Sequence, residues 1–224
     1  MPLLLRVAHV CAAAVGAALV ALSLLNIWMA RIALGRNVYV SGLGADGEPT
    51  ARWFEAALLL LVAGGLAVAW VARGIRSRAR LLRCWPPALS IAAACALFLV
   101  ASQVPCTSGC PAPVGDAFTW QDLTHTTSAV LAFALAAFAM LQVSFSDGHP
   151  ALRRFSLATA VLVAVIAATG GIMSLLQFRT DIGSILEFVA TTIGIGWLIV
   201  LGLLTGFAPA PRPALPGTPR LAAK

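Results

Sequence analysis

The chain has 224 residues, of which 60% are hydrophobic and 10% are charged, and its mean hydropathy is +0.94. Soluble domains carry about 25% charged residues. This composition therefore excludes an ordinary soluble domain and indicates an integral membrane protein. The net charge of +7 is explained by basic residues beside the membrane ends, which meet anionic lipid headgroups. We therefore expect membrane lipids as partners and no nucleic acid.

Six apolar segments follow one another, and each approaches the roughly 20 residues that cross a hydrocarbon core. They cover residues 7–30, 54–72, 88–104, 123–145, 155–176 and 184–207. The first is longer than the apolar part of a cleaved signal peptide, so we expect it to be retained. The pattern predicts an all-α, polytopic membrane protein: a six-transmembrane-helix bundle in one domain, residues 1–207. Residues 208–224 contain five prolines and are expected to form a disordered cytoplasmic tail.

Basic residues lie mostly in alternate connections between these segments. One side holds Arg6, Arg73, Arg76, Arg78, Arg80, Arg83, Arg153, Arg154, Arg212, Arg220 and Lys224, and the other holds only Arg31, Arg36, Arg52 and Arg179. Short cytoplasmic loops are enriched in Lys and Arg, so this asymmetry predicts that both termini are cytoplasmic. We expect a multi-pass protein of the cell inner (plasma) membrane. The cytoplasmic stretch 73–83 is a candidate binding site for a protein partner.

Acidic residues show the opposite bias, which the positive-inside rule does not explain. Seven of the eight lie in outer loops or at the outer ends of segments: Asp46, Glu48, Glu55, Asp116, Asp122, Asp181 and Glu187. Three of them, Glu55, Asp122 and Glu187, enter the segments themselves. An ionisable group at membrane depth is expensive and usually faces the bundle interior, so these three mark a candidate functional site.

His125 adds an imidazole to this candidate site. Asp122 and His125 are three residues apart and therefore share a helix face. A carboxylate beside an imidazole can orient the ring and raise its basicity, as a general base requires. Asp122, His125 and Glu187 are thus the candidate catalytic residues.

Structural interpretations of the same residues stay open. Asp122 and Glu55 can cap the helices that they begin, and Arg52 or Arg179 can pair with an acid at the interface. The acids are therefore compatible with an ion-pair network, a lipid-headgroup or ligand site, or a catalytic site. One histidine with three acids is a weak metal signal, and no nucleotide-binding or metalloprotease motif is present. We predict no metal site, and the sequence identifies no cofactor.

Two cysteines bracket Thr-Ser-Gly in the predicted outer loop 104–111. Cys106 and Cys110 face an oxidising compartment if this loop is outside. We favour a disulfide between them. Two free thiols are the alternative, and a metal site is less favoured because no histidine or second cysteine pair lies nearby in sequence.

Several short segments resemble a large bacterial family of membrane proteins of unknown function. They are residues 39–54, which begin Tyr-Val-Ser-Gly-Leu-Gly, residues 106–111, residues 121–125, and Gly183 with Glu187. The chain is more distantly similar to the Frag/DRAM/Sfk-type membrane proteins, whose first outer loop carries a similar Tyr-x-Ser-x-x-Gly segment. Phe188 follows Glu187 where the bacterial pattern commonly has an arginine.

This resemblance implies six spans and an outer face formed by Ser41, Asp122, His125 and Glu187. The candidate ligand-binding residues are Tyr39, Ser41, Glu55 and Arg179. Relatives in the wider group include a lipid-remodelling factor for GPI anchors, autophagy modulators and a phosphoinositide-kinase regulator, so the fold does not select one function. We predict an outward-facing polar site that recognises or remodels a lipid or lipid-linked glycan. The alternative is a non-catalytic scaffold or regulator of a partner protein, and whether the protein is an enzyme stays open.

Overall fold

Six long helices make up the computed structural model, which describes residues 3–83, 85–111, 116, 118–147 and 150–207. They are α1 (Leu3–Leu34), α2 (Ala51–Val71), α3 (Pro87–Gln103), α4 (Trp120–Ser144), α5 (Pro150–Leu175) and α6 (Thr180–Gly206). Three short 3-10 helices lie in the connections: η1 (Ser41–Gly44), η2 (Ala72–Gly74) and η3 (Arg80–Arg83). The predicted disordered tail, residues 208–224, lies outside the described residues.

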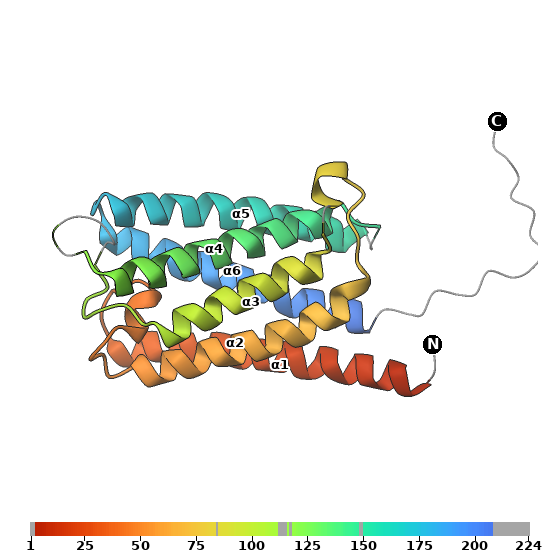
Figure 1. The fold of residues 1–224 in the computed structure, drawn as a ribbon, viewed down its shortest axis with the longest axis horizontal. Coiled ribbons are helices and arrows are strands. Elements are labelled where there is room, and N and C mark those ends of the chain that lie inside the picture. Colours follow the sequence, from red (N-terminus) through yellow and green to blue (C-terminus); the bar gives the residue numbers. More distant parts are fainter. Residues whose placement is uncertain (1–2, 84, 112–115, 117, 148–149, 208–224) are drawn as a thin grey trace, which may run out of the picture.

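The helices form a closed ring in which each packs against its neighbour in sequence. α1 contacts α2, α2 contacts α3, and so on until α6 returns to α1. The connections α1–α2, α3–α4 and α5–α6 gather at one end of the bundle, on the left in Figure 1, which we call the disulfide end. The connections α2–α3 and α4–α5 lie at the other end with the start of α1 and the end of α6. We call this the arginine end, because it carries Arg73–Arg83.

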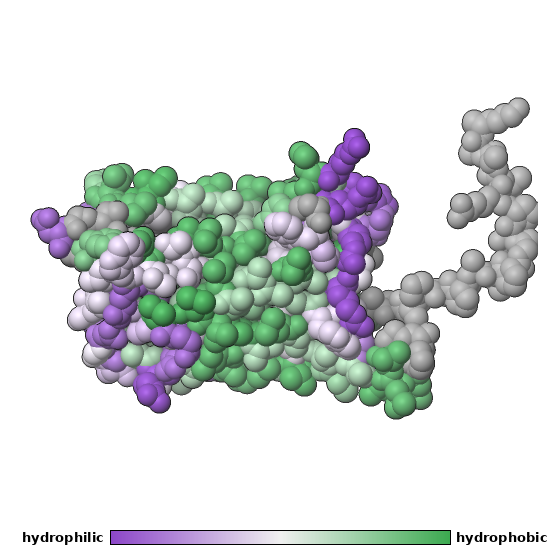
Figure 2. Space-filling view, in the orientation of Figure 1, coloured by the Kyte–Doolittle hydropathy of each residue, from purple (hydrophilic) through white to green (hydrophobic). Residues whose placement is uncertain are grey.

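The surface of the bundle is that of a protein that crosses a membrane. Figure 2 shows a broad hydrophobic band across the middle of the visible face and hydrophilic residues gathered toward its two ends. Five helices, α1, α2, α4, α5 and α6, are long and apolar enough to span, and α3 is apolar but has only 17 residues. The chain is therefore a multi-pass integral membrane protein with an all-helical fold.

The observed helices extend beyond the apolar segments predicted from the sequence. α1 ends at Leu34 rather than near residue 30, and α4 begins at Trp120 rather than at residue 123. The difference has a physical cause: hydropathy locates the lipid-facing stretch, whereas backbone hydrogen bonds continue through polar and aromatic residues at the interface. The extra turns bring the polar residues of the disulfide end into regular helices.

Small residues let neighbouring helices approach closely. A Cβ atom on Gly64 of α2 would lie 2.7 Å from the carbonyl oxygen of Gly16 on α1, and one on Gly206 of α6 would lie 2.0 Å from the Cβ of Ala13. Helix association in lipid depends on such backbone proximity, because apolar side chains gain little by leaving a hydrocarbon solvent. These contacts hold α1 between α2 and α6.

Candidate functional site

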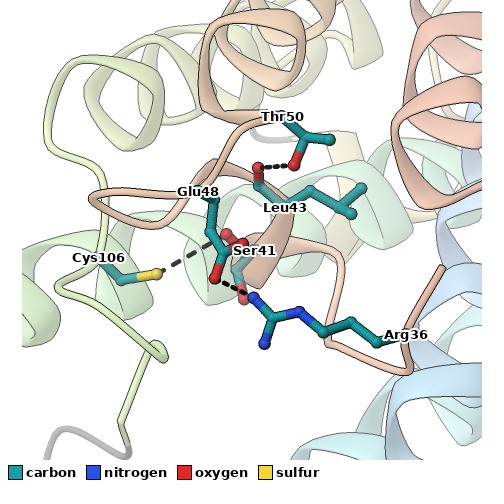
Figure 3. Close-up of polar contacts among 6 residues, drawn as sticks. All are labelled: Arg36, Ser41, Leu43, Glu48, Thr50 and Cys106. Carbon is teal, nitrogen blue, oxygen red and sulfur yellow. Dashed lines mark hydrogen bonds and ion pairs between the residues drawn. The ribbon is translucent and has the colours of Figure 1, made fainter. Parts of the chain in front are cut away.

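The disulfide end is organised around a tight cysteine ring. Cys106 and Cys110 are joined by a disulfide, and Gly109 and Cys110 have positive φ, which closes the ring after only four residues. The hydroxyl of Ser41, in η1, donates to the Sγ of Cys110 at 3.6 Å. The Sγ of Cys106 lies 3.7 Å from the carbonyl oxygen of Ser41, as the dashed line in Figure 3 marks. The ring is therefore docked onto the first loop of the protein.

The first loop, residues 35–50, has its own polar contacts. Figure 3 shows Arg36 paired with Glu48 and the hydroxyl of Thr50 donating to the carbonyl of Leu43 at 2.8 Å. The side chain of Glu48 is nearly buried. These contacts fold the loop over the end of the bundle and position η1 beside the cysteine ring.

Asp122 joins the cysteine ring to the start of α4. Its carboxylate accepts hydrogen bonds from the backbone N–H of Thr107 at 2.8 Å, the hydroxyl of Thr107 at 2.8 Å and the hydroxyl of Thr119 at 2.5 Å. Thr119 is also the N-cap residue, since its hydroxyl accepts the N–H of Asp122. Asp122 has no exposed surface. The cap of α4 is therefore Thr119 and not Asp122, whose carboxylate instead tethers the loop to the helix.

His125 is held by the end of another helix. Its Nδ1 lies 3.0 Å from the carbonyl oxygen of Ala101 and 2.8 Å from that of Val104, at the end of α3, where helical carbonyls lack partners. Carbonyl oxygens only accept, so Nδ1 carries a hydrogen, and in the Nδ1–H tautomer the lone pair lies on Nε2. The prediction that Asp122 orients the imidazole is wrong: backbone carbonyls of α3 orient it. Its predicted catalytic role is a separate matter and stays a prediction.

Glu187 reaches the first loop from α6. Its Oε2 accepts the backbone N–H of Val40 at 2.8 Å, and the amide of Ser41 interacts with the same carboxylate. These amides begin η1, so Glu187 supplies the acceptor that the short helix lacks. Beside it, Tyr39 packs against α6 so closely that a Cβ on Gly183 would lie 2.5 Å from the phenol oxygen. Burial raises the pKa of Tyr39.

The other predicted residues lie nearer the surface. Glu55 pairs with Arg52 at 3.7 Å, and Arg179 pairs with Asp181 at 3.4 Å. Arg179, a predicted ligand-binding residue, lines neither of the cavities described below. The structure thus brings Ser41, Asp122, His125 and Glu187 to one end of the bundle but assigns Arg179 to an exposed pair.

A cavity runs through the middle of the ring. It has about 100 Å³ of space that the centre of a water molecule can occupy, and every helix contributes to its wall. The wall is mostly apolar, with Ile91 and Phe98 from α3, Phe133 from α4 and Leu198 from α6 among its residues. Its polar residues are Ser41, His125, Glu187 and Thr191. We call this space the central cavity.

A second, more polar pocket opens at the disulfide end, with about 190 Å³ measured in the same way. Asp46, Arg52, Glu55 and Ser102 line it, and we call it the outer pocket. Four residues line both spaces: Phe54, Leu58, Ala101 and His125. His125 therefore lies at the boundary between a polar pocket and an apolar cavity.

Sequence reasoning missed two polar residues. Thr191 lines the central cavity and is only 6% exposed, and its hydroxyl has no hydrogen-bond partner among the described residues. Its position one turn after Glu187 was the available signal. Arg31 was also missed: its guanidinium lies 4.1 Å above the ring of Phe188, a cation–π contact between α1 and α6.

The residues that could bind a metal ion also differ from the histidine and three acids considered from the sequence. Within the described residues, the grouped ligand atoms are those of Cys106, Cys110 and His125, which lie within 4.8 Å of one another. Zinc and copper bind thiolates, and a disulfide sulfur is not one. The oxidised ring therefore leaves His125 as the only ligand of this group.

Taken together, the fold and the cavities define a multi-pass membrane protein whose helical ring encloses an apolar cavity with a polar mouth. The family model of a protein of unknown function, DUF998, matches residues 12–204, so the chain belongs to the DUF998 family. No curated protein matches the chain, and no solved structure does either.

Proposed function

We propose that this protein recognises or remodels a membrane lipid or lipid-linked glycan, whose polar part lies in the outer pocket and whose apolar part enters the central cavity. One observation carries the proposal: His125 borders both spaces, so a ligand that passes from one to the other meets its ring. An apolar space with a few placed polar groups is the usual form of a ligand site.

The polar groups of the outer pocket suit a lipid headgroup. Arg52 and Glu55 form a pair at its rim, and the Arg52 side chain is 93% exposed, so its guanidinium is accessible to a phosphate or sugar hydroxyl. Asp46 is fixed by Gln121, whose side-chain amide donates to it at 2.8 Å. Charges of both signs at the mouth fit a polar head better than a purely apolar ligand.

Six spans with cytoplasmic termini are part of the same proposal. α4 begins at the disulfide end, because Gln121 contacts Asp46 of the first loop, whereas α2 ends at the arginine end. The chain must return between them, and α3 is the helix that does so. Its 17 residues correspond to about 25 Å, slightly less than the hydrocarbon core of about 30 Å. The protein then lies in the inner membrane. The arginines of residues 73–83 face the cytoplasm, and the outer pocket faces the opposite side.

Remodelling of the ligand requires a group that can accept a proton. The geometry at His125 supplies one, because Nδ1–H is occupied by two carbonyls and Nε2 keeps its lone pair. Asp122 and Glu187 then act by holding the loops in place rather than by direct proton transfer.

Two substitutions of His125 test this proposal. Asparagine can place its side-chain N–H near the position of Nδ1, so His125→Asn keeps the donor to Ala101 and Val104 but removes Nε2. The longer glutamine side chain places its amide beyond the position of Nδ1, so His125→Gln removes the donor to Ala101 and Val104 instead. We expect His125→Asn to fold normally and to fail complementation in cells that lack the gene, whereas His125→Gln should lose stability as well.

Lipid analysis provides the second measurement. Protein purified in mild detergent is extracted with organic solvent, and the recovered lipids are compared with the bulk membrane by mass spectrometry. Enrichment of one lipid or lipid-linked glycan, reduced in His125→Asn, supports the proposal. Recovery of bulk lipids alone, together with full complementation by His125→Asn, overturns it.

A protein-binding function is the second candidate. Arg76, Arg80 and Arg83 are exposed at the arginine end, and Leu81 between them is 90% exposed. A leucine amid arginines fits an interface with an acidic partner that also buries an apolar side chain. Charge reversal at Arg80 and Arg83 tests this scaffold function: loss of complementation with unchanged bound lipid favours it over the lipid site.

A further inference from the structure

The central cavity is long for its volume. On α4 its lining residues are His125, Ala129, Phe133, Ala136 and Met140, one stripe of the helix. Fifteen residues of helix correspond to about 22 Å, and the lining of α6, from Glu187 to Leu198, corresponds to about 16 Å. The cavity therefore reaches from the disulfide end to near the middle of the bundle or beyond.

Its width follows from its volume. Spread over roughly 20 Å, the volume of about 100 Å³ gives a mean width of about 5 Å once the radius of a water molecule is added. Carbon atoms touch at about 3.5–4.0 Å, so one extended hydrocarbon chain needs roughly this width and two parallel chains need about twice as much. The cavity is wide enough for one chain only.

Buried residues lie at the inner end of the cavity. Trp197 is 2% exposed, and its indole N–H donates to the hydroxyl of Ser156 at 2.9 Å. Met140 is completely buried, and Gln142 beyond it accepts from Ser90 and donates to the carbonyls of Leu82 and Trp85. A floor held by these hydrogen bonds sets a limit on the length of chain that can enter.

The polar end of the cavity is suited to an uncharged group. Thr191 lines the cavity, is nine-tenths buried and has a hydroxyl without a partner among the described residues, and such a buried hydroxyl costs free energy. His125 lines the same cavity from α4. Among the described residues that line the cavity there is no lysine or arginine, so a phosphate finds no cation inside. An ester, amide or protonated carboxyl group can bond Thr191.

We propose that the central cavity binds one unbranched acyl chain of a single-chain amphiphile, with the carbonyl group of the chain at its polar end, beside His125. This rests on the proposed lipid-binding function and adds the number and length of the chains. An all-trans chain advances roughly 1.3 Å per carbon, so a cavity of about 16–22 Å takes roughly 12–17 carbons. A free fatty acid and a lysophospholipid both supply such a chain. A phospholipid with two chains does not fit.

Native mass spectrometry of the delipidated full-length protein tests this directly. The probes are free fatty acids and lysophosphatidylcholines of increasing chain length, with a two-chain phosphatidylcholine for comparison. We expect one bound chain per protein, an optimum within the stated length, and exclusion of the two-chain lipid from this site. Binding of the fatty acid alone, or of both single-chain probes, identifies the headgroup that is accepted and supports the proposal in either case.

Variants that raise the floor sharpen the test. Ala136 lines the cavity one turn before Met140, so Ala136→Phe should shorten the preferred chain by about 6 Å, or roughly four to five carbons. Ala134 is exposed on the same helix, and Ala134→Phe is the matched control, with no change expected. Gly194→Leu fills the cavity from α6, where an added Cβ meets only Met140 at 3.8 Å. It is the second variant should Ala136→Phe unfold.

The outcomes separate this inference from the function on which it rests. An unchanged optimum in folded Ala136→Phe or Gly194→Leu, or equal binding of the two-chain lipid, overturns the single-chain proposal and leaves lipid binding intact. If the wild-type protein retains no amphiphile of any kind, the proposed function fails first.

Discussion

Removal of the Asp122 carboxylate is expected to destabilise the protein strongly. The carboxylate accepts three hydrogen bonds, two from Thr107 and one from Thr119, and has no exposed surface. Asp122→Ala leaves the N–H of Thr107 without a partner and frees the cysteine ring from α4. Each unpaired buried group costs about 1–3 kcal/mol, so we expect a loss of about 3–4 kcal/mol in the free energy of unfolding.

Asp122→Asn should have a smaller effect. The amide oxygen can accept the Thr107 N–H, and the amide nitrogen can donate to hydroxyls, which rotate to accept. What is lost is the charge on the acceptor, which roughly doubles the strength of such bonds, so we expect a loss of about 1–2 kcal/mol.

The assay is equilibrium unfolding in mixed micelles, with circular dichroism as the probe. Thr124→Val is the matched control, because the Thr124 hydroxyl bonds only to the carbonyl of Trp120 in its own helix at an exposed position. An Asp122→Ala protein that unfolds at the same denaturant concentration as the wild type refutes the tether. Loss of function in a fully stable Asp122→Asn would instead restore the catalytic role predicted from the sequence.

Three further predictions follow from the fold. In protein purified without reductant, mass spectrometry after alkylation should find Cys106 and Cys110 unmodified, and replacing both with serine should cost roughly 2 kcal/mol of stability for so short a ring; free thiols in such material would contradict the pairing. A cysteine placed at Gly47 should react with an impermeant reagent from outside and one at Arg80 should not, and the reverse result would invert the orientation. Gly64→Val should lower the melting temperature by separating α1 from α2, because even a single Cβ lies 2.7 Å from backbone oxygen; an unchanged melting temperature would show that the helices can move apart freely.

The helices could be predicted because each carries its own signal. A stretch of apolar residues must cross or enter a membrane whatever its neighbours are, so all six long helices were located from hydropathy alone. The segment predicted at 88–104 agrees with α3 to within one residue at each end, although this helix has only 17 residues. The start of α4 agrees less well: Thr119 as the N-cap of α4 lies outside the apolar segment that predicted the helix.

The candidate site could be predicted only in part, because its partners are distant in sequence or lie in the backbone. The acids and the histidine were identified as residue types that are costly in a membrane. Their partners could not be: the carbonyls of Ala101 and Val104 that hold His125 are present in every residue, and Glu187 bonds an amide 147 positions away. Spacing along α4 suggested a contact between Asp122 and His125, but the tertiary contacts of each take precedence over proximity on one helix.

The partners found in the structure change the chemistry that the acids can perform. Asp122 and Glu187 both accept backbone amides, from Thr107 and Val40, so each is engaged in holding a loop over the bundle. If such a carboxylate accepted a proton from a substrate, its hydrogen bonds to the loop amides would weaken and the loop would lose its attachment. The polar atoms left to face a ligand are then the Nε2 of His125 and the hydroxyl of Thr191, both on the rigid helices that line the central cavity. Groups on rigid elements hold a reacting carbonyl more accurately than groups on loops, which is why we place the chemistry of any remodelling at His125.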